Sequence, residues 1–280
     1  MAEGFDRSAA DYQRARFLAL VHRIQSVVSG RPRRLLAFDD VRERLRLGGP
    51  LYRGVQSVPL AQIIGSVDRY RDFDRLFLPT QSHTEDRWRK ISRAWYDEVD
   101  LPPVLLYKVG EVYFVVDGNH RVSVAREHGQ THIDAEVREV ESRVPVTPDI
   151  RAEDLQRMGE KVEFLERTRL DRLRPEAVVE PTILGGYDRL LEHICVHRYF
   201  MGIDEKRPVS EEQSVTHWYD TLYRPVVDLV ESSDVLEEFP GRTATDLYLW
   251  IMDHLHFLRG QPGGEQAGPA EAAEDFIESA

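Results

Sequence analysis

The clearest candidate for chemistry in this sequence lies between a predicted strand, residues 112–116, and a predicted helix, residues 119–128. The junction consists of Asp117, Gly118, Asn119, His120 and Arg121. The first backbone N–H groups of a helix lack partners within the helix and favour anions. Gly118 lets the backbone approach a ligand closely, and the guanidinium of Arg121 matches phosphate oxygens. The junction therefore predicts a phosphate-binding loop, in which His120 donates a hydrogen bond to phosphate or relays a proton.

The same residues also fit a purely structural interpretation. Asp117 would cap the helix, Gly118 would form the turn, and His120 would be an exposed surface residue. The sequence alone leaves both interpretations open.

A second candidate segment, residues 65–74, follows the first predicted strand of the same region. Arg69 and Arg71 are its candidate phosphate ligands. Asp68 is a candidate for holding Mg²⁺ together with Asp117, because carboxylates bind this ion beside substrate phosphates. The alternative for this segment is a surface ladder of ion pairs.

The spacing of apolar residues predicts the elements that must hold these side chains. Apolar residues three and four apart between 9 and 28 predict an amphipathic helix within an N-terminal helical segment, residues 1–49. Gly110-Glu111 predicts a tight turn between two strands. The β-prone runs that predict strands are residues 55–60, 104–109, 112–116 and 133–140. We therefore expect a small mixed α+β domain over residues 50–145.

The order of these features resembles the ParB N-terminal and sulfiredoxin-like superfamily over about residues 50–141. The resemblance rests on residues 55–63 (Val-Gln-Ser-Val-Pro-Leu-Ala-Gln-Ile), on the hairpin, and on Asp-Gly-Asn-His-Arg after the hairpin. In that superfamily the glycine-containing loop after the hairpin holds nucleotide phosphates. The resemblance therefore implies a nucleotide ligand, ATP, ADP or CTP, with Mg²⁺ bridging through Asp117 or Asp68.

Departures from the motifs of the superfamily narrow the implied activity. Sulfiredoxin carries its catalytic cysteine where this chain has Asn119, which argues against that reaction. Partition proteins have Gly-Glu-Arg-Arg where this chain has Gly-Asn-His-Arg, so CTP hydrolysis of their kind is not implied. The loop is most similar to the Asp-Gly-His-His-Arg of a free-serine kinase, which implies kinase-like phosphoryl transfer to a small hydroxyl compound. Asp68, Asp117 or Glu111 would then act as the general base.

The second half of the chain has a different character. Strand signals stop, and the apolar spacing predicts an all-α domain over residues 146–259. Its segments Trp218–Asp220 and Leu247–Trp250 resemble a bacterial C-terminal domain of unknown function, which implies no activity. Residues 260–280 are mostly Gly, Pro, Ala and acidic residues and predict a disordered tail.

Two groups in this half have residue types that bind ligands. His193 and His197 are four residues apart beside Glu192, and histidines at this spacing share a helix face, as metal ligands often do. The alternative is that they are partly buried structural histidines. Residues 239–246 enter a predicted helix and predict either an anion site or an ordinary turn and cap.

The charge distribution bears on nucleic-acid binding. The chain has a net charge of −12, and residues 146–280 carry 14 basic and 28 acidic side chains. The arginine-rich stretch lies near the start and contains Arg31, Arg33, Arg34, Arg42, Arg44 and Arg46. A DNA-binding regulator that uses these arginines is an alternative function, but the acidic half disfavours it because duplex binding depends on neutralising phosphates.

The remaining expectations concern location and partners. No apolar run approaches the roughly 20 residues that span a bilayer, so we expect no membrane segment. The lone Cys195 and the absence of an apolar leader favour the cytoplasm. A non-enzymatic adaptor whose acidic helical half binds another protein is a third alternative, and a homodimer is compatible with the composition.

Overall fold

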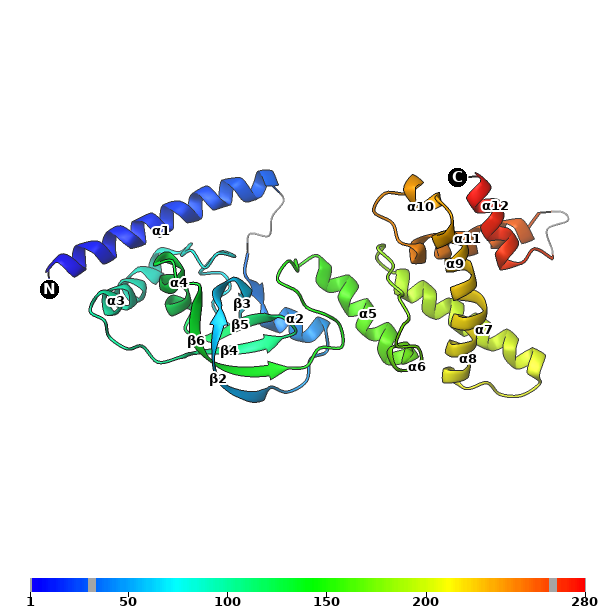
Figure 1. The fold of residues 1–280 in the computed structure, drawn as a ribbon, viewed down its shortest axis with the longest axis horizontal. Helices are drawn as coiled ribbons and strands as arrows, with labels where there is room; N and C mark the ends of the chain where they lie inside the picture. Colours follow the sequence, from blue (N-terminus) through cyan, green and yellow to red (C-terminus); the bar gives the residue numbers. More distant parts are fainter. Residues whose placement is uncertain (1, 30–33, 262–265, 280) are drawn as a thin grey trace. The chain divides into compact units, whose positions relative to one another are not determined.

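The computed structural model describes residues 2–29, 34–261 and 266–279 (Figure 1). The chain forms two compact units that separate after Leu155. The predicted boundary at residue 145 therefore lies inside the first unit, and the N-terminal segment also belongs to that unit. A mixed sheet in the first unit and helices alone in the second confirm the predicted α+β class. In the described residues, no helix is long and apolar enough to cross a membrane.

The first unit is built on a mixed sheet, which has six strands in the described residues. The strands are β1 (Leu36–Ala37), β2 (Leu51–Pro59), β3 (Ile63–Ser66), β4 (Val104–Val109), β5 (Val112–Asp117) and β6 (His132–Val140). Their order is β1-β3-β5-β4-β6-β2. The β4–β5 and β6–β2 pairs are antiparallel, and the other neighbours are parallel. The predicted hairpin is the β4–β5 pair, with β5 inside the sheet.

Helices and short 3₁₀ turns connect these strands. They are α1 (Ala2–Ser29), α2 (Phe38–Arg44), η1 (Leu60–Gln62), η2 (Ser82–Thr84), α3 (Glu85–Tyr96) and α4 (Asn119–Glu127). In Figure 1, α1 lies along α3, which it contacts. The fully buried Trp88 joins α3 to α4, because its indole Nε1 donates to the hydroxyl of Ser123 over 2.9 Å.

The helix predicted near the N-terminus is confirmed, but most of its apolar face is not covered. Tyr12 and Ala15 are buried, and the ring of Tyr12 lies 5.6 Å from that of Trp88. Phe17 and Ile24, which the spacing assigns to the buried face, are more than half exposed. The apolar face of the predicted amphipathic helix is therefore only partly buried, although His22 in its second half still contacts the buried Asp74 over 2.8 Å.

Two buried arginines fix the loop that follows β3. Arg126 of α4 donates to the carbonyls of Leu60 and Ile63 and lies 5.1 Å from the ring centre of Phe77. Arg75 donates to the carbonyl of Ile64 over 3.1 Å. Burial lowers the pKa of each guanidinium to about 10, which leaves both charged at neutral pH. Arg126 also donates to the carbonyl of Arg75 over 3.4 Å, so the two side chains join α4 and β3 to the end of the loop that carries residues 68–74.

The second unit contains only helices in the residues that the structure describes. After α5 (Asp154–Thr168), which begins in the first unit, they are α6 (Leu170–Leu173), α7 (Gly186–Glu205), α8 (Glu211–Trp218), η3 (Tyr219–Tyr223), α9 (Arg224–Ser232), α10 (Val235–Glu238), α11 (Ala244–Arg259) and α12 (Pro269–Ser279). A π-helical turn, η3, separates α8 from α9, and Pro225 lies in the first turn of α9. Trp218, Tyr223 and Tyr248 fill the core.

The predicted disordered tail is wrong for residues 269–279, which form α12. Ala272 and Ala273 are fully buried, and Phe276 and Ile277 lie against the same core. Composition misled here because two alanines and two larger apolar residues on one helix face are enough to dock a short helix.

Candidate phosphate-binding site

The loop between β5 and α4 lies at a polar cavity of about 210 Å³. Its lining consists of Asp68, Arg69, Arg87, Ile91, Val116, Asp117, Gly118, Asn119, His120 and Arg121. Most of the residues that the sequence singled out in two separate segments therefore meet at one place. We call this space the polar cavity.

Gly118 is the N-cap of α4 and has a φ of +111°. A Cβ atom at this position would lie 2.5 Å from Cγ1 of Val104, closer than any relaxed contact. Glycine is therefore required at this position for two reasons. It adopts the positive φ readily, and it leaves room for the close contact with β4. The first residues of α4, Asn119 to Arg121, line the polar cavity, and the N–H of Val122 bonds to the carbonyl of Gly118 as the first bond within the helix.

Asn119 and His120 are both 5% exposed. Among the described residues, neither Oδ1 of Asn119 nor Nδ1 of His120 has a hydrogen-bond partner. The imidazole meets the ring of Phe73 edge to face, with the centroids 5.3 Å apart. Burial, and after it the positive charges of Arg87 and Arg69, together lower the pKa of His120 to about 4. At neutral pH His120 is therefore a neutral donor and acceptor, and an exposed surface histidine is ruled out.

Arg121 is more constrained than the sequence suggested. One guanidinium nitrogen lies 2.5 Å from Oδ2 of Asp117, and another donates to the carbonyls of Pro102 and Pro103. The guanidinium is mostly buried, whereas Asp117 is exposed. Asp117 does not cap α4 with its side chain. Arg121 thus holds the segment before β4 and contributes its positive charge at the edge of the polar cavity.

Only part of the candidate segment after β3 lies at the polar cavity. Asp68 and Arg69 line the polar cavity, and Arg69 also pairs with Asp72 over 3.1 Å. Arg71 does not line it, since its guanidinium lies over the ring of Tyr70 at 5.5 Å. Glu111, a third candidate base, lies in the β4–β5 turn and lines neither this cavity nor its neighbour.

Arg87 is a lining residue that the sequence analysis did not single out. It lies on α3, one turn before Ile91, which also lines the polar cavity. Arg87 has no motif around it, and only the packing of α3 on α4 brings it to the loop. Arg69, Arg87 and Arg121 therefore come from three separate segments to one cavity.

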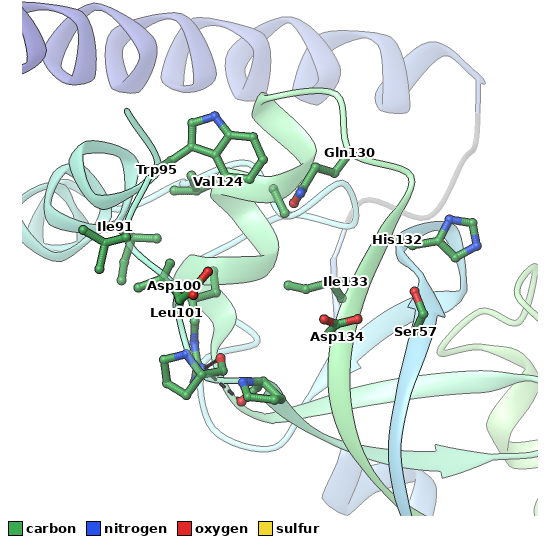
Figure 2. Close-up of a pocket in the computed structure, with 15 residues that line it drawn as sticks. Ser57, Ile91, Trp95, Asp100, Leu101, Val124, Gln130, His132, Ile133 and Asp134 are labelled. Atoms are coloured by element: carbon green, nitrogen blue, oxygen red, sulfur yellow. Dashed lines mark hydrogen bonds between the residues drawn. The ribbon is translucent and has the colours of Figure 1, made fainter. Parts of the chain in front are cut away.

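A second cavity of about 290 Å³ adjoins the first, and Ile91 and Arg121 line both. We call it the mixed cavity. Figure 2 shows Ile91 and Trp95 of α3 on one side and Ser57 and Asp134 of β2 and β6 on the other. Its apolar lining is Ile91, Trp95, Val99, Leu101, Pro102, Pro103, Val124, Ala125 and Ile133. Its polar lining is Ser57, Asp100, Arg121, Gln130, His132 and Asp134.

The histidines of the second unit do not converge. Nε2 of His197 lies 2.8 Å from Nδ1 of His217, while the ring of His193 packs edge-on against Tyr248. His254, on α11, pairs with Asp275. Among the residues that the structure describes, no three His, Cys, Asp or Glu side chains gather as a metal site requires.

The loop before α11 is a turn and a cap. Thr243 and Asp246 form a reciprocal capping box, and the buried carboxylate of Asp246 also accepts bonds from the N–H and hydroxyl of Thr182. A buried carboxylate already lies at this helix start, which disfavours a second anion there. The geometry fits the turn and cap, the alternative to an anion site.

The arginine-rich stretch is only partly visible, because Arg31 and Arg33 lie outside the described residues. The other four, Arg34, Arg42, Arg44 and Arg46, are exposed.

Comparison with known protein families, with curated proteins and with solved structures found no match to this chain.

Proposed function

We propose that this protein binds a nucleotide, or another small phosphorylated ligand, with its phosphates in the polar cavity. The observation that carries the proposal is Nδ1 of His120, a buried nitrogen that has no partner among the described residues and lies at the start of a helix. Buried polar groups are almost always hydrogen-bonded, so this nitrogen favours a ligand. Phosphate oxygens accept from Nδ1–H of the neutral imidazole and from the helix N–H groups, while Oδ1 of Asn119, which also has no partner among these residues, would accept from a hydroxyl of the ligand.

The charges around the polar cavity suit a phosphate and a divalent cation. Three arginines line it against two carboxylates, Asp68 and Asp117. Mg²⁺ is commonly held by one or two carboxylates together with substrate phosphates, so these two residues fit the ion. When bound, Mg²⁺ would neutralise phosphate charge, while the arginines orient the phosphates.

The mixed cavity has room for the organic part of the ligand. It is lined by the flat indole of Trp95, by aliphatic side chains and by the carboxylates of Asp100 and Asp134. A nucleobase needs such an apolar slot with a few hydrogen-bonding groups at its rim. Because Arg121 and Ile91 border both cavities, one molecule can occupy both.

The resemblance to the ParB and sulfiredoxin-like superfamily extends this proposal to kinase-like phosphoryl transfer or nucleotide hydrolysis. Asp68 is the candidate base that the geometry favours, since it is exposed in the polar cavity whereas Asp117 is paired with Arg121. A base must reach the proton of the attacking hydroxyl.

We further infer a cytoplasmic location, which the lone, unpaired Cys195 supports.

The first experiment is a thermal-unfolding titration with ATP, ADP, CTP, GTP and inorganic phosphate, each with and without Mg²⁺. A ligand at a hundred times its Kd should stabilise the native state by about 2.7 kcal/mol. Every ligand that binds is then tested for turnover, and Asp68→Asn should abolish turnover while it still binds the ligand in the absence of Mg²⁺.

Matched arginine variants locate the site. Arg69→Ala and Arg87→Ala should each weaken binding by roughly 10- to 100-fold, as expected for the loss of a charged hydrogen bond. Arg71→Ala removes the same charge two residues away, outside the polar cavity, and should bind normally. No stabilisation by any of these ligands, or equal losses in all three variants, would reject the proposal.

A further inference from the structure

The second unit carries an apolar stripe that its core does not use. On α7, Val196, Tyr199, Phe200 and Ile203 are each 53–66% exposed. Tyr199, Phe200 and Ile203 follow Val196 by three, four and seven residues, which places all four on one helix face. The buried residues of the same helix, Tyr187, Leu190 and Ile194, lie on the opposite face and belong to the core. We call these four exposed residues the α7 stripe.

We propose that the α7 stripe is the contact surface of a homodimer, in which α7 pairs with α7 of a second copy in an antiparallel arrangement. A two-fold axis must bring the same patch of both copies together, so the patch has to complement itself. The spacing of the four residues of the α7 stripe is the same whether it is counted from Val196 or from Ile203. With the axis between Tyr199 and Phe200, Val196 of one copy lies level with Ile203 of the other, and the four aromatic rings gather around the axis.

The charges at the ends of the stripe favour the same arrangement. Glu192 is exposed one turn before the stripe, and Arg207 is exposed just after the end of α7. Arg207 pairs within its own chain with Glu205. Because antiparallel helices place the start of one beside the end of the other, Glu192 lies near the Arg207 end of α7 of the second copy, whereas a parallel pair would place like charges together.

A second copy fits the stripe better than a lipid surface does. Amphipathic helices that bind membranes carry Lys and Arg along their polar face. The polar positions that end α7 are the exposed acids Asp204 and Glu205 instead. The pair is small compared with a standard protein interface, so we expect a dimer that dissociates in the micromolar range.

The test is sedimentation of the full chain from about 1 µM to about 100 µM, a range that brackets a micromolar Kd. The mass should rise with concentration from 32.4 kDa towards twice that value. The double substitution Tyr199→Glu/Phe200→Glu should keep the chain folded and monomeric throughout. Val178→Glu is the matched control, because it adds a carboxylate at an equally exposed apolar residue off α7 and should dimerise normally.

A charge-reversal pair tests the antiparallel arrangement itself. Glu192→Arg and Arg207→Glu should each weaken the dimer about two- to fivefold, and the double reversal should restore it, as for an exposed ion pair. A chain that stays monomeric at every concentration overturns the proposal. A dimer that survives the Tyr199/Phe200 substitution, or one that the double reversal does not restore, also overturns it.

Discussion

At the residue scale, the backbone of Gly118 decides whether the phosphate-binding loop can form. Gly118→Ala should destabilise the chain by roughly 2–4 kcal/mol, from the positive φ and the collision with Val104. Chemical denaturation measures this loss. Gly129→Ala is the control, because Gly129 also has a positive φ, +72°, but an added Cβ would meet nothing within 4 Å. Equal losses in the two variants would show that the approach to Val104 is unimportant.

His120 should make stability depend on pH in a defined window. Its pKa is about 4 in the native state and 6.5 for an ordinary histidine, so only the unfolded chain binds a proton between these values. Stability therefore falls as the pH drops from about 6.5 to about 4, and this contribution is constant above that window. In His120→Asn the slope should be smaller by up to about 1.4 kcal/mol per pH unit.

Denaturation at several pH values between 4 and 8 gives these slopes. The same substitution at His256, an exposed position on α11, controls for the loss of a histidine. An unchanged slope in His120→Asn would contradict the buried, neutral imidazole. A bound phosphate should raise the pKa of His120, because it brings negative charge to a ring that now faces arginines.

At the element scale, the sequence predicted the strands whose side chains follow a clear pattern. β4 and β5 were located because both are apolar runs interrupted by Gly110, which has a φ of +58°. β1 and β3 were missed. β1 is only two residues long, and β3 is a four-residue strand buried on both faces that directly follows a 3₁₀ turn, so neither shows alternation.

The candidate site was predictable only where it is continuous in sequence. The loop from Asp117 to Arg121 carries its own turn and helix start, and these local features were sufficient. Arg87 was not predictable, because α3 reaches the loop through the packing of Trp88 on Ser123. The sequence also could not show that Arg71 lies outside the polar cavity. Arg69 and Arg71 have the same side chain, and only the fold of the loop directs them to different places.

The anchoring of α4 to the loop after β3 leads to a prediction about Arg126. Arg126→Met keeps most of the aliphatic volume but leaves the buried carbonyls of Leu60 and Ile63 without this donor. We expect a loss of roughly 2–5 kcal/mol, since each unsatisfied buried carbonyl costs about 1–3 kcal/mol. Arg138→Met, on the partly exposed β6 strand, should cost less than about 1 kcal/mol.

Hydrogen exchange provides the local readout for Arg126→Met. Faster exchange should be concentrated in α4, in residues 60–66 and in the segment around Arg75, because these are the segments that Arg126 joins. Faster exchange spread evenly over the first unit would mean that Arg126 contributes to general stability rather than to the position of the loop.

At the scale of the whole molecule, the charge distribution favours a small anion over a duplex. Three arginines and two aspartates meet at the polar cavity, while the second half of the chain is strongly acidic. Duplex binding depends on neutralising many phosphates with Lys and Arg, and the acidic half has too few of these residues to contribute. A nucleotide needs only the cavity, so the net charge of −12 does not oppose its binding in the same way.

The two-unit organisation predicts that damage to the second unit leaves the polar cavity intact. Ala272→Glu places a carboxylate at a fully buried position of α12 and should lower the stability of the second unit by roughly 2–5 kcal/mol, limited by the cost of undocking α12. Ala270→Glu, at an exposed position of the same helix, should change little. In scanning calorimetry only one of two transitions should move in Ala272→Glu, and ligand stabilisation of the other should persist. Identical melting of the two variants would instead mean that residues 269–279 behave as the disordered tail that their composition suggests.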